Sequence, residues 1–130
     1  MPSVFTKIID GDIPCYKIAE DDLHFAFLDI NPLTQGHTLV VPKQETDYIF
    51  DLEDNALAAL HLFAKKVATA IKISVPCVRV GVAVIGLEVP HAHIHLVPFN
   101  NMQQINFSNQ KLIFTKEEFE EIASKIRKGF

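Results

Sequence analysis

The chain has 130 residues, enough to bury the core of one domain. Its formal net charge of −4 argues against a broad electrostatic grip on nucleic acid, which depends on many Lys and Arg side chains at phosphates. No apolar run is long enough to span a bilayer, and no charged-then-apolar leader opens the chain. With two isolated cysteines, Cys15 and Cys77, the sequence predicts a cytoplasmic protein that binds neither nucleic acid nor membrane.

The first part of the chain alternates apolar runs with turn residues. Apolar residues at roughly helical spacing predict a helix over residues 3–9, which ends at Gly11. Apolar runs bounded by turn signals predict three strands, at residues 17–19, 23–30 and 37–41.

Asp29 lies on the same face of the second predicted strand as Phe25 and Phe27. A carboxyl that ends an aromatic stripe is typical of a ligand pocket, where a polar group sits on an apolar wall. Asp29 equally suits the start of the turn at Asn31, where its side chain would accept hydrogen bonds from backbone amides. The strand pattern leaves both interpretations open.

The second part of the chain predicts a long helix over residues 51–73, with Asp51 as its N-cap. Alternating valines predict a strand over residues 77–85, which pairs with the strand that follows it as a hairpin. Residues 100–114 are polar and predict a loop, with a short strand at 112–114.

A final helix is predicted from the run Thr115-Lys116-Glu117-Glu118. This is a capping-box pattern, in which the threonine and the second glutamate satisfy each other's backbone amides. The apolar positions that follow have helical spacing.

Three histidines occupy alternate positions in the run Pro90-His91-Ala92-His93-Ile94-His95-Leu96-Val97-Pro98. A period of two is the strand period, so the histidines would share one face while the apolar residues between them point into a core. Each neutral imidazole carries a donor and an acceptor that need partners, and histidine titrates near physiological pH. The pattern therefore indicates a chemical site.

Two chemistries suit this pattern. His93, flanked on both sides, could attack an electrophile such as phosphorus while its neighbours hold the developing charge. Alternatively the histidines could bind zinc or iron, although Glu88 and His37, the candidate further ligands, are not at a diagnostic spacing. We favour the nucleophilic reaction, which requires no metal and no cofactor.

The histidine run resembles the signature of the histidine triad (HIT) superfamily of nucleotide hydrolases and transferases. Residues 5–14 resemble the family's N-terminal segment, and residues 27–32 and 36–43 resemble its nucleoside-binding strands. The resemblance implies one α+β domain over residues 1–130, with its core at about 4–98 and an extension at 99–130. It implies an antiparallel sheet of about five strands, one long helix packed on the sheet, a C-terminal helix and a homodimer.

For the site, the resemblance implies that His93 forms a nucleotidyl-histidine on the α-phosphorus of a purine nucleotide. His95 and His37 would contact phosphate oxygens, and His91 would orient His93. Asp29 would bind the ribose hydroxyls. The base pocket would be lined by Phe5, Ile8, Phe27, Ile30 and Leu39.

The run Gly86-Leu87-Glu88 departs from the family, many of whose members have Gly-Gln followed by Ser or Thr there. Leu87 cannot donate a hydrogen bond, and an ionised Glu88 would repel a phosphate. Glu88 is therefore either a turn carboxylate in water or a protonated group that contacts the phosphate or the leaving group. Glu45 stands where many members have histidine. Two alternatives to an enzyme with a covalent histidine intermediate stay open: a catalytically weak nucleotide-binding regulator, and a metal-dependent hydrolase that uses the same histidines.

Overall fold

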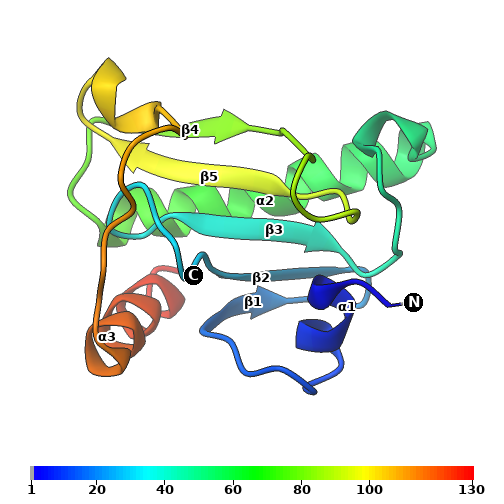
Figure 1. Cartoon of the computed structure of the whole chain (residues 1–130), viewed down its shortest axis with the longest axis horizontal. Helices are drawn as coiled ribbons and strands as arrows, with labels where there is room; N and C mark the ends of the chain where they lie inside the picture. The colour runs from blue at the N-terminus through cyan, green and yellow to red at the C-terminus, as the bar shows by residue number, and fades with distance from the viewer. Residues whose placement is uncertain (1) are drawn as a thin grey trace.

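A five-stranded antiparallel sheet with the strand order β1-β2-β3-β5-β4 forms the centre of the computed structural model, which describes residues 2–130 (Figure 1). The strands are β1 (Lys17–Glu20), β2 (His24–Leu28), β3 (Thr38–Pro42), β4 (Arg79–Ala83) and β5 (Ile94–Phe99). The α-helices are α1 (Val4–Ile9), α2 (Asp54–Ser74) and α3 (Lys116–Arg127), and two short 3-10 turns are η1 (Ile49–Asp51) and η2 (Met102–Ile105). The predicted α+β fold is confirmed.

Strand β5 lies between β3 and β4, and this position brings distant segments together. It pairs antiparallel with β4, as the predicted hairpin requires, and Leu39 of β3 lies opposite His95. Only His95 lies within the paired strand; His93 lies just before it, and His91 lies in the bend that leads into it. The histidines and the end of β3 are therefore neighbours across the sheet.

The main core lies on one face of the sheet, under α2 and α3, as Figure 1 shows for α2 behind β3 and β5. Alternate strand residues point into it, as the two-residue period requires. Ala92, Ile94 and Leu96, between the histidines, are buried there as predicted. The apolar stripe of α3 adds its residues to the same core: Phe119, Ile122, Ala123 and Ile126.

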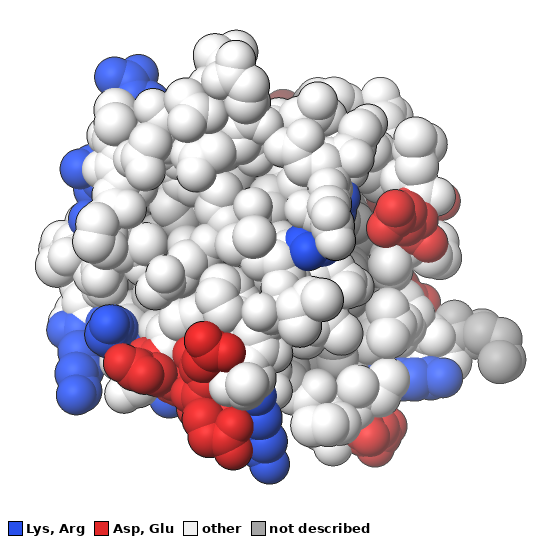
Figure 2. Space-filling view, turned by 60° about the vertical axis from the view of Figure 1, so that its left-hand side comes forward, with Lys and Arg blue, Asp and Glu red and all other residues white. Residues whose placement is uncertain are grey.

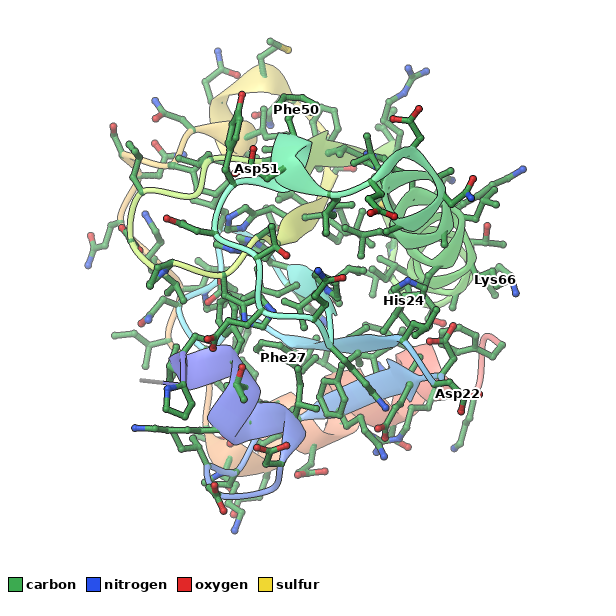
Figure 3. All side chains as sticks on the ribbon, turned by 90° about the vertical axis from the view of Figure 1, so that its right-hand side faces the viewer. Asp22, His24, Phe27, Phe50, Asp51 and Lys66 are labelled. Carbon is green, nitrogen blue, oxygen red and sulfur yellow. The ribbon has the colours of Figure 1, made fainter. Side chains whose placement is uncertain are left out.

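A second, smaller apolar cluster lies on the opposite face of the sheet. It joins Phe5 of α1 to residues of β2 and β3: Phe25, Phe27, Leu39 and Val41. The rings of Phe5 and Phe27 meet edge to face at 5.6 Å, and Figure 3 shows Phe27 on the side of β2 that faces α1. This cluster forms the floor on which the candidate site is built.

Two details of the sequence prediction are wrong. Helix α2 begins at Asp54 with Glu53 as its N-cap, whereas Asp51 lies in the separate turn η1 (Figure 3). That turn forms its own backbone hydrogen bonds and buries Ile49, so the chain bends before the helix begins. The predicted strand at residues 112–114 is not formed either, because no neighbouring strand pairs with this segment within residues 2–130.

The predicted capping box of α3 is confirmed, with Thr115 and Glu118 bonding each other's backbone amides.

Figure 2 shows acidic and basic side chains gathered at the lower edge of one face, where α3 lies, and a broad area with few charges above it. Within residues 2–130, no helix has both the length and the apolar character needed to cross a membrane.

Candidate active site

A pocket of about 440 Å³ opens on the face of the sheet that carries α1. The structure brings together in its lining ten of the residues that sequence reasoning selected: Phe5, Ile8, Phe27, Asp29, Ile30, His37, Leu39, Glu88, His93 and His95. The histidines are buried, with His93 6% and His95 8% exposed, so an exposed face of solvated histidines is ruled out. His91 is fully buried behind the pocket and does not line it.

The backbone assigns the proton of His93. Its Nδ1 lies 2.8 Å from the carbonyl oxygen of His91, and a carbonyl only accepts, so Nδ1 carries the proton and donates. Nε2 therefore keeps its lone pair. Within residues 2–130 no fully buried side-chain nitrogen or oxygen lacks a partner, so Nε2, which makes no hydrogen bond, is accessible from the pocket. Burial lowers the pKa of His93, which keeps the ring neutral at pH 7.

His37 and His95 form a directed hydrogen-bond chain that starts at a backbone amide. The Leu33 N–H donates to Nδ1 of His37 across 3.0 Å, so the proton of His37 is on Nε2. Nε2 in turn donates to Nδ1 of His95 across 3.0 Å, which leaves the His95 proton on Nε2. Burial lowers the pKa of His37 to about 3 and that of His95 to about 4. His95 is therefore a neutral donor beside His93, at a ring separation of 4.9 Å.

His91 connects the triad to the N-terminal segment. Its Nε2 donates to the carbonyl of Pro42 across 2.8 Å, so its Nδ1 accepts, and the Ser3 hydroxyl lies 2.7 Å from it. Ser3 also caps α1, because its hydroxyl accepts from the Thr6 N–H. His91 thus holds both the end of β3 and the start of α1 in place.

Glu45 fixes the same segment from the other side. Its carboxylate accepts from the Ser3 N–H and, across 2.8 Å, from the Thr6 hydroxyl. These bonds to the charged form lower the pKa of Glu45 to about 2, with the Ser3 amide as the largest cause. Sequence reasoning noted Glu45 only as a departure from the family and assigned no role to Ser3 or Thr6. Their contacts join segments about forty residues apart, which no local pattern reveals.

Both interpretations of Asp29 hold at once. One carboxylate oxygen accepts from the Asn31 N–H across 2.8 Å, as in a turn, while the other lies 3.6 Å from Nε2 of His37 within the pocket. Burial raises the pKa of Asp29. Glu88 is exposed at the rim of the pocket, where its charge adds to the rise that burial gives to the pKa of Asp29 and partly opposes the fall that burial gives to the pKa of His93.

Asp29, His37 and His95 also have the spacing of a metal site, with one ligand atom from each within 4.8 Å of the others. The hydrogen bonds oppose this use. The Leu33 amide occupies the Nδ1 lone pair of His37, so a metal on Nε2 would have to displace the only ring proton. These residues fit a chain of hydrogen bonds better than a metal.

Two pocket residues come from the polar segment after β5 and were missed by sequence reasoning. Phe107 packs edge to face against His95 at 4.8 Å, and Lys111 lines the pocket beside it. The segment has no apolar period and lies beyond the resemblance, so the sequence carries no signal for either. Cys15 also lines the pocket, but burial raises its pKa, so its thiol stays protonated and is a poor nucleophile.

Comparison with known proteins agrees with this geometry. The HIT domain family model matches residues 10–102. A HIT-like protein of Borreliella burgdorferi is 36% identical, with 95% of this chain and 94% of the relative covered. An adenosine 5'-monophosphoramidase of Schizosaccharomyces pombe is 37% identical, with 98% of this chain and 100% of the relative covered.

Solved structures share the fold over nearly the whole chain. A HIT-like protein of Bartonella henselae superposes with a TM-score of 0.85 at 30% identity, covering 98% of this chain and 96% of the other. A zinc-bound histidine triad family protein of Mycobacterium smegmatis gives a TM-score of 0.83 at 30% identity, covering 97% and 91%. With the family model matching most of the sequence, this chain belongs to the HIT, or histidine triad, family.

Proposed function

We propose that this protein is a nucleotide hydrolase or nucleotidyltransferase that acts at the α-phosphate of a purine nucleotide conjugate, through a covalent intermediate on His93. The observation that carries this proposal is the tautomer of His93. A neutral ring whose Nδ1–H is bound by a carbonyl presents an Nε2 lone pair to the pocket, which is what a histidine nucleophile requires.

The pocket divides into parts that suit the parts of a nucleotide. An aromatic and aliphatic floor, including Phe5, Phe27 and Leu39, suits a purine base. Asp29 offers a carboxylate to the ribose hydroxyls. The α-phosphate then lies at His93 and His95, where the Nε2–H of His95 donates to a phosphate oxygen.

The reaction follows in two steps. Nε2 of His93 forms a bond to the α-phosphorus as the bond to the leaving group breaks, and the leaving group departs with the electron pair and takes up a proton. The ring gains positive charge, which the bond from Nδ1–H to the His91 carbonyl stabilises. Water then attacks the phosphorus and releases a proton to solvent, which replaces the proton taken up by the leaving group, while the P–N bond breaks and its electron pair returns to His93. The free nucleoside monophosphate is released.

The relatives support this substrate class. The Schizosaccharomyces pombe protein is named as an adenosine 5'-monophosphoramidase, and it aligns over almost all of both chains. A phosphoramidate of adenosine monophosphate is accordingly the first conjugate to test for turnover, and the relative's name does not fix which leaving group this chain prefers.

A nucleotide-binding regulator with little turnover is the second candidate. Leu87 lines the pocket without a hydrogen-bond donor, and Glu88 brings a negative charge to the rim where a phosphate would arrive. Both features weaken phosphate binding in the transition state, and neither removes the nucleophile.

We also propose that the protein is a cytoplasmic homodimer. Strand β4 is an outer strand of the sheet, and its Val82 is 60% exposed, as is the neighbouring Val78 at 62%. An apolar outer strand normally needs a cover, which a second copy would provide. The two free cysteines suit a reducing compartment.

The test is turnover by exhaustively chelated protein of three substrates: an adenosine phosphoramidate, a dinucleoside polyphosphate and a sugar nucleotide. Turnover of at least one, at a rate unchanged by chelation, supports the covalent mechanism. Activity that chelation removes and zinc alone restores would favour a metal-dependent hydrolase. Tight binding of adenosine monophosphate without turnover of any conjugate would favour the regulator.

A further inference from the structure

The pocket is closed on one side by residues 106–112, here called the arm. The arm follows η2 and lies beyond residue 102, where the match to the family model ends. It is held in place by backbone bonds: the Leu112 N–H donates to the Pro32 carbonyl across 2.9 Å, and the Asn109 N–H donates to Asn106 across 3.0 Å. The amide of Asn109 also donates to the Gln103 carbonyl across 2.6 Å. The arm is therefore a fixed part of the pocket wall.

Lys111 is the only lysine or arginine in the lining of this pocket, as far as residues 2–130 show. Its Nζ donates to the carbonyls of Phe107, at 2.6 Å, and Asn109, at 2.8 Å. An ammonium group has three donors, so one remains for a ligand. The charge already acts within the pocket, because it opposes the rise that burial gives to the pKa of Asp29 and adds to the fall that burial gives to the pKa of His37.

The arm lies at the opposite end of the histidine row from the apolar floor. Phe5 packs against His91 and His93, at ring separations of 5.7 and 4.9 Å. Phe107 packs against His95 and His37, at 4.8 and 6.1 Å. The pocket therefore extends past His93 in both directions, and its lining at the end away from Phe5 includes Lys111, where a group beyond the α-phosphate can be bound.

We propose that Lys111 is a specificity-determining residue that binds an anionic leaving group, so that this chain favours conjugates whose leaving group carries phosphate. The inference rests on the proposed function and names the substrate class of the same site. Its physical basis is charge. Asp29 and Glu88 both line the pocket, and both repel an anion that enters it. Lys111 is the cation that offsets them.

The test compares Lys111→Met with wild type on two substrates that share adenosine monophosphate and differ in the leaving group. Diadenosine tetraphosphate has an anionic leaving group, and adenosine 5'-phosphoramidate has an uncharged one. We expect kcat/KM for the tetraphosphate to fall about tenfold, the loss that one charge-assisted hydrogen bond predicts. The value for the phosphoramidate should change less than about twofold. Lys111→Arg should recover part of the loss, since it keeps the charge.

Lys116→Met is the matched control, because Lys116 is exposed at the start of α3 and does not line the pocket. Lys116→Met should leave kcat/KM unchanged for both substrates. An equal loss on both substrates in Lys111→Met would overturn the inference, because it would place Lys111 on the shared nucleotide. No loss on either would overturn it as well.

Binding measured by calorimetry separates this inference from the proposed function. If wild type turns over neither substrate, the proposed function fails. Lys111→Met should still lower the affinity for diadenosine tetraphosphate about tenfold, while the affinity for adenosine monophosphate should not change. If wild type and Lys111→Met bind diadenosine tetraphosphate with equal affinity, the role of Lys111 is rejected independently of the proposed function.

Discussion

Nδ1 of His93 donates to the backbone carbonyl of His91, two residues earlier in the chain, across 2.8 Å. The partner that fixes the tautomer is thus main chain, so no side-chain substitution at position 91 removes it directly. The side chain of His91 acts at one remove, by holding the carbonyl in place through Pro42 and Ser3. We therefore treat His91 as a positioning residue.

Replacing His93 with Ala or Asn should abolish turnover, because it removes the covalent route. Binding of adenosine monophosphate should persist, since Phe27 and Asp29 remain in the pocket. Rapid quench with a labelled substrate should trap label on the wild-type protein and none on either variant. Near-full activity of His93→Ala would show that another group is the nucleophile.

Ser3→Ala should destabilise the protein by roughly 2 kcal/mol, because it removes the cap of α1 and leaves Nδ1 of the buried His91 without a partner. Urea unfolding measures this change. Thr115→Ala is the control, since it removes a cap of the same kind without touching a histidine. Thr115→Ala should lower the free energy of unfolding by about 1 kcal/mol. Equal losses in the two variants would mean that the Ser3–His91 bond contributes nothing.

The stability of the protein should decrease as the pH falls from 7 to 5. His37 and His95 have folded-state pKa values of about 3 and 4, below their ordinary 6.5. In this window the unfolded chain therefore binds protons that the native state does not. Each histidine should contribute a slope that approaches about 1.4 kcal/mol per pH unit well below 6.5 and fades out above it.

Urea unfolding at pH 7, 6 and 5 checks this dependence, and His37→Gln should reduce the slope. Asp29 acts in the opposite sense, because its folded-state pKa is raised and its native form retains a proton longer. A stability that is flat between pH 7 and pH 5 would contradict the burial of neutral imidazoles. The acid limb of kcat/KM should likewise lie below 6.5, since the pKa of His93 is lowered.

Glu88→Gln and Glu88→Ser should turn over substrate as fast as wild type or faster. Glu88 is exposed at the rim, and removing its charge lessens the repulsion of an arriving phosphate. The acid limb should also move to lower pH, because the charge of Glu88 raises the pKa of His93. Full pH–rate profiles measure both effects. A large loss in Glu88→Gln, together with the disappearance of the alkaline limb, would instead make Glu88 a general acid.

Local patterns predicted most of the helices and strands, and within the site they indicated the histidines and Asp29. The base-pocket residues Phe5, Ile8 and Ile30 came from the family resemblance. The period of two around Ile94 correctly assigns the core face of β5, and Thr115 and Glu118 correctly mark the start of α3. The pattern failed at Asp51, where an acidic residue before an apolar stripe looks the same whether it caps the helix or lies in the turn before it.

Long-range contacts account for what the sequence left out. The bond between Ser3 and His91 spans 88 residues, and the arm is positioned by the bond from Leu112 to Pro32. Nothing in the composition of residues 106–112 indicates a pocket wall, because the segment is polar and aperiodic. Lys111 acquires its place from the fold alone.

The arm connects η2, which follows β5, to helix α3. Helix α3 packs into the main core beneath the opposite face of the sheet. A change that loosens α3 and also breaks the bond from Leu112 to Pro32 would free the arm and move Lys111 away from the pocket, even if it lies far from the histidines. Such a change would alter the preference among conjugates. The tautomer of His93 would not change, because the backbone carbonyl of His91 fixes it. Selectivity and reactivity can therefore evolve separately in this chain.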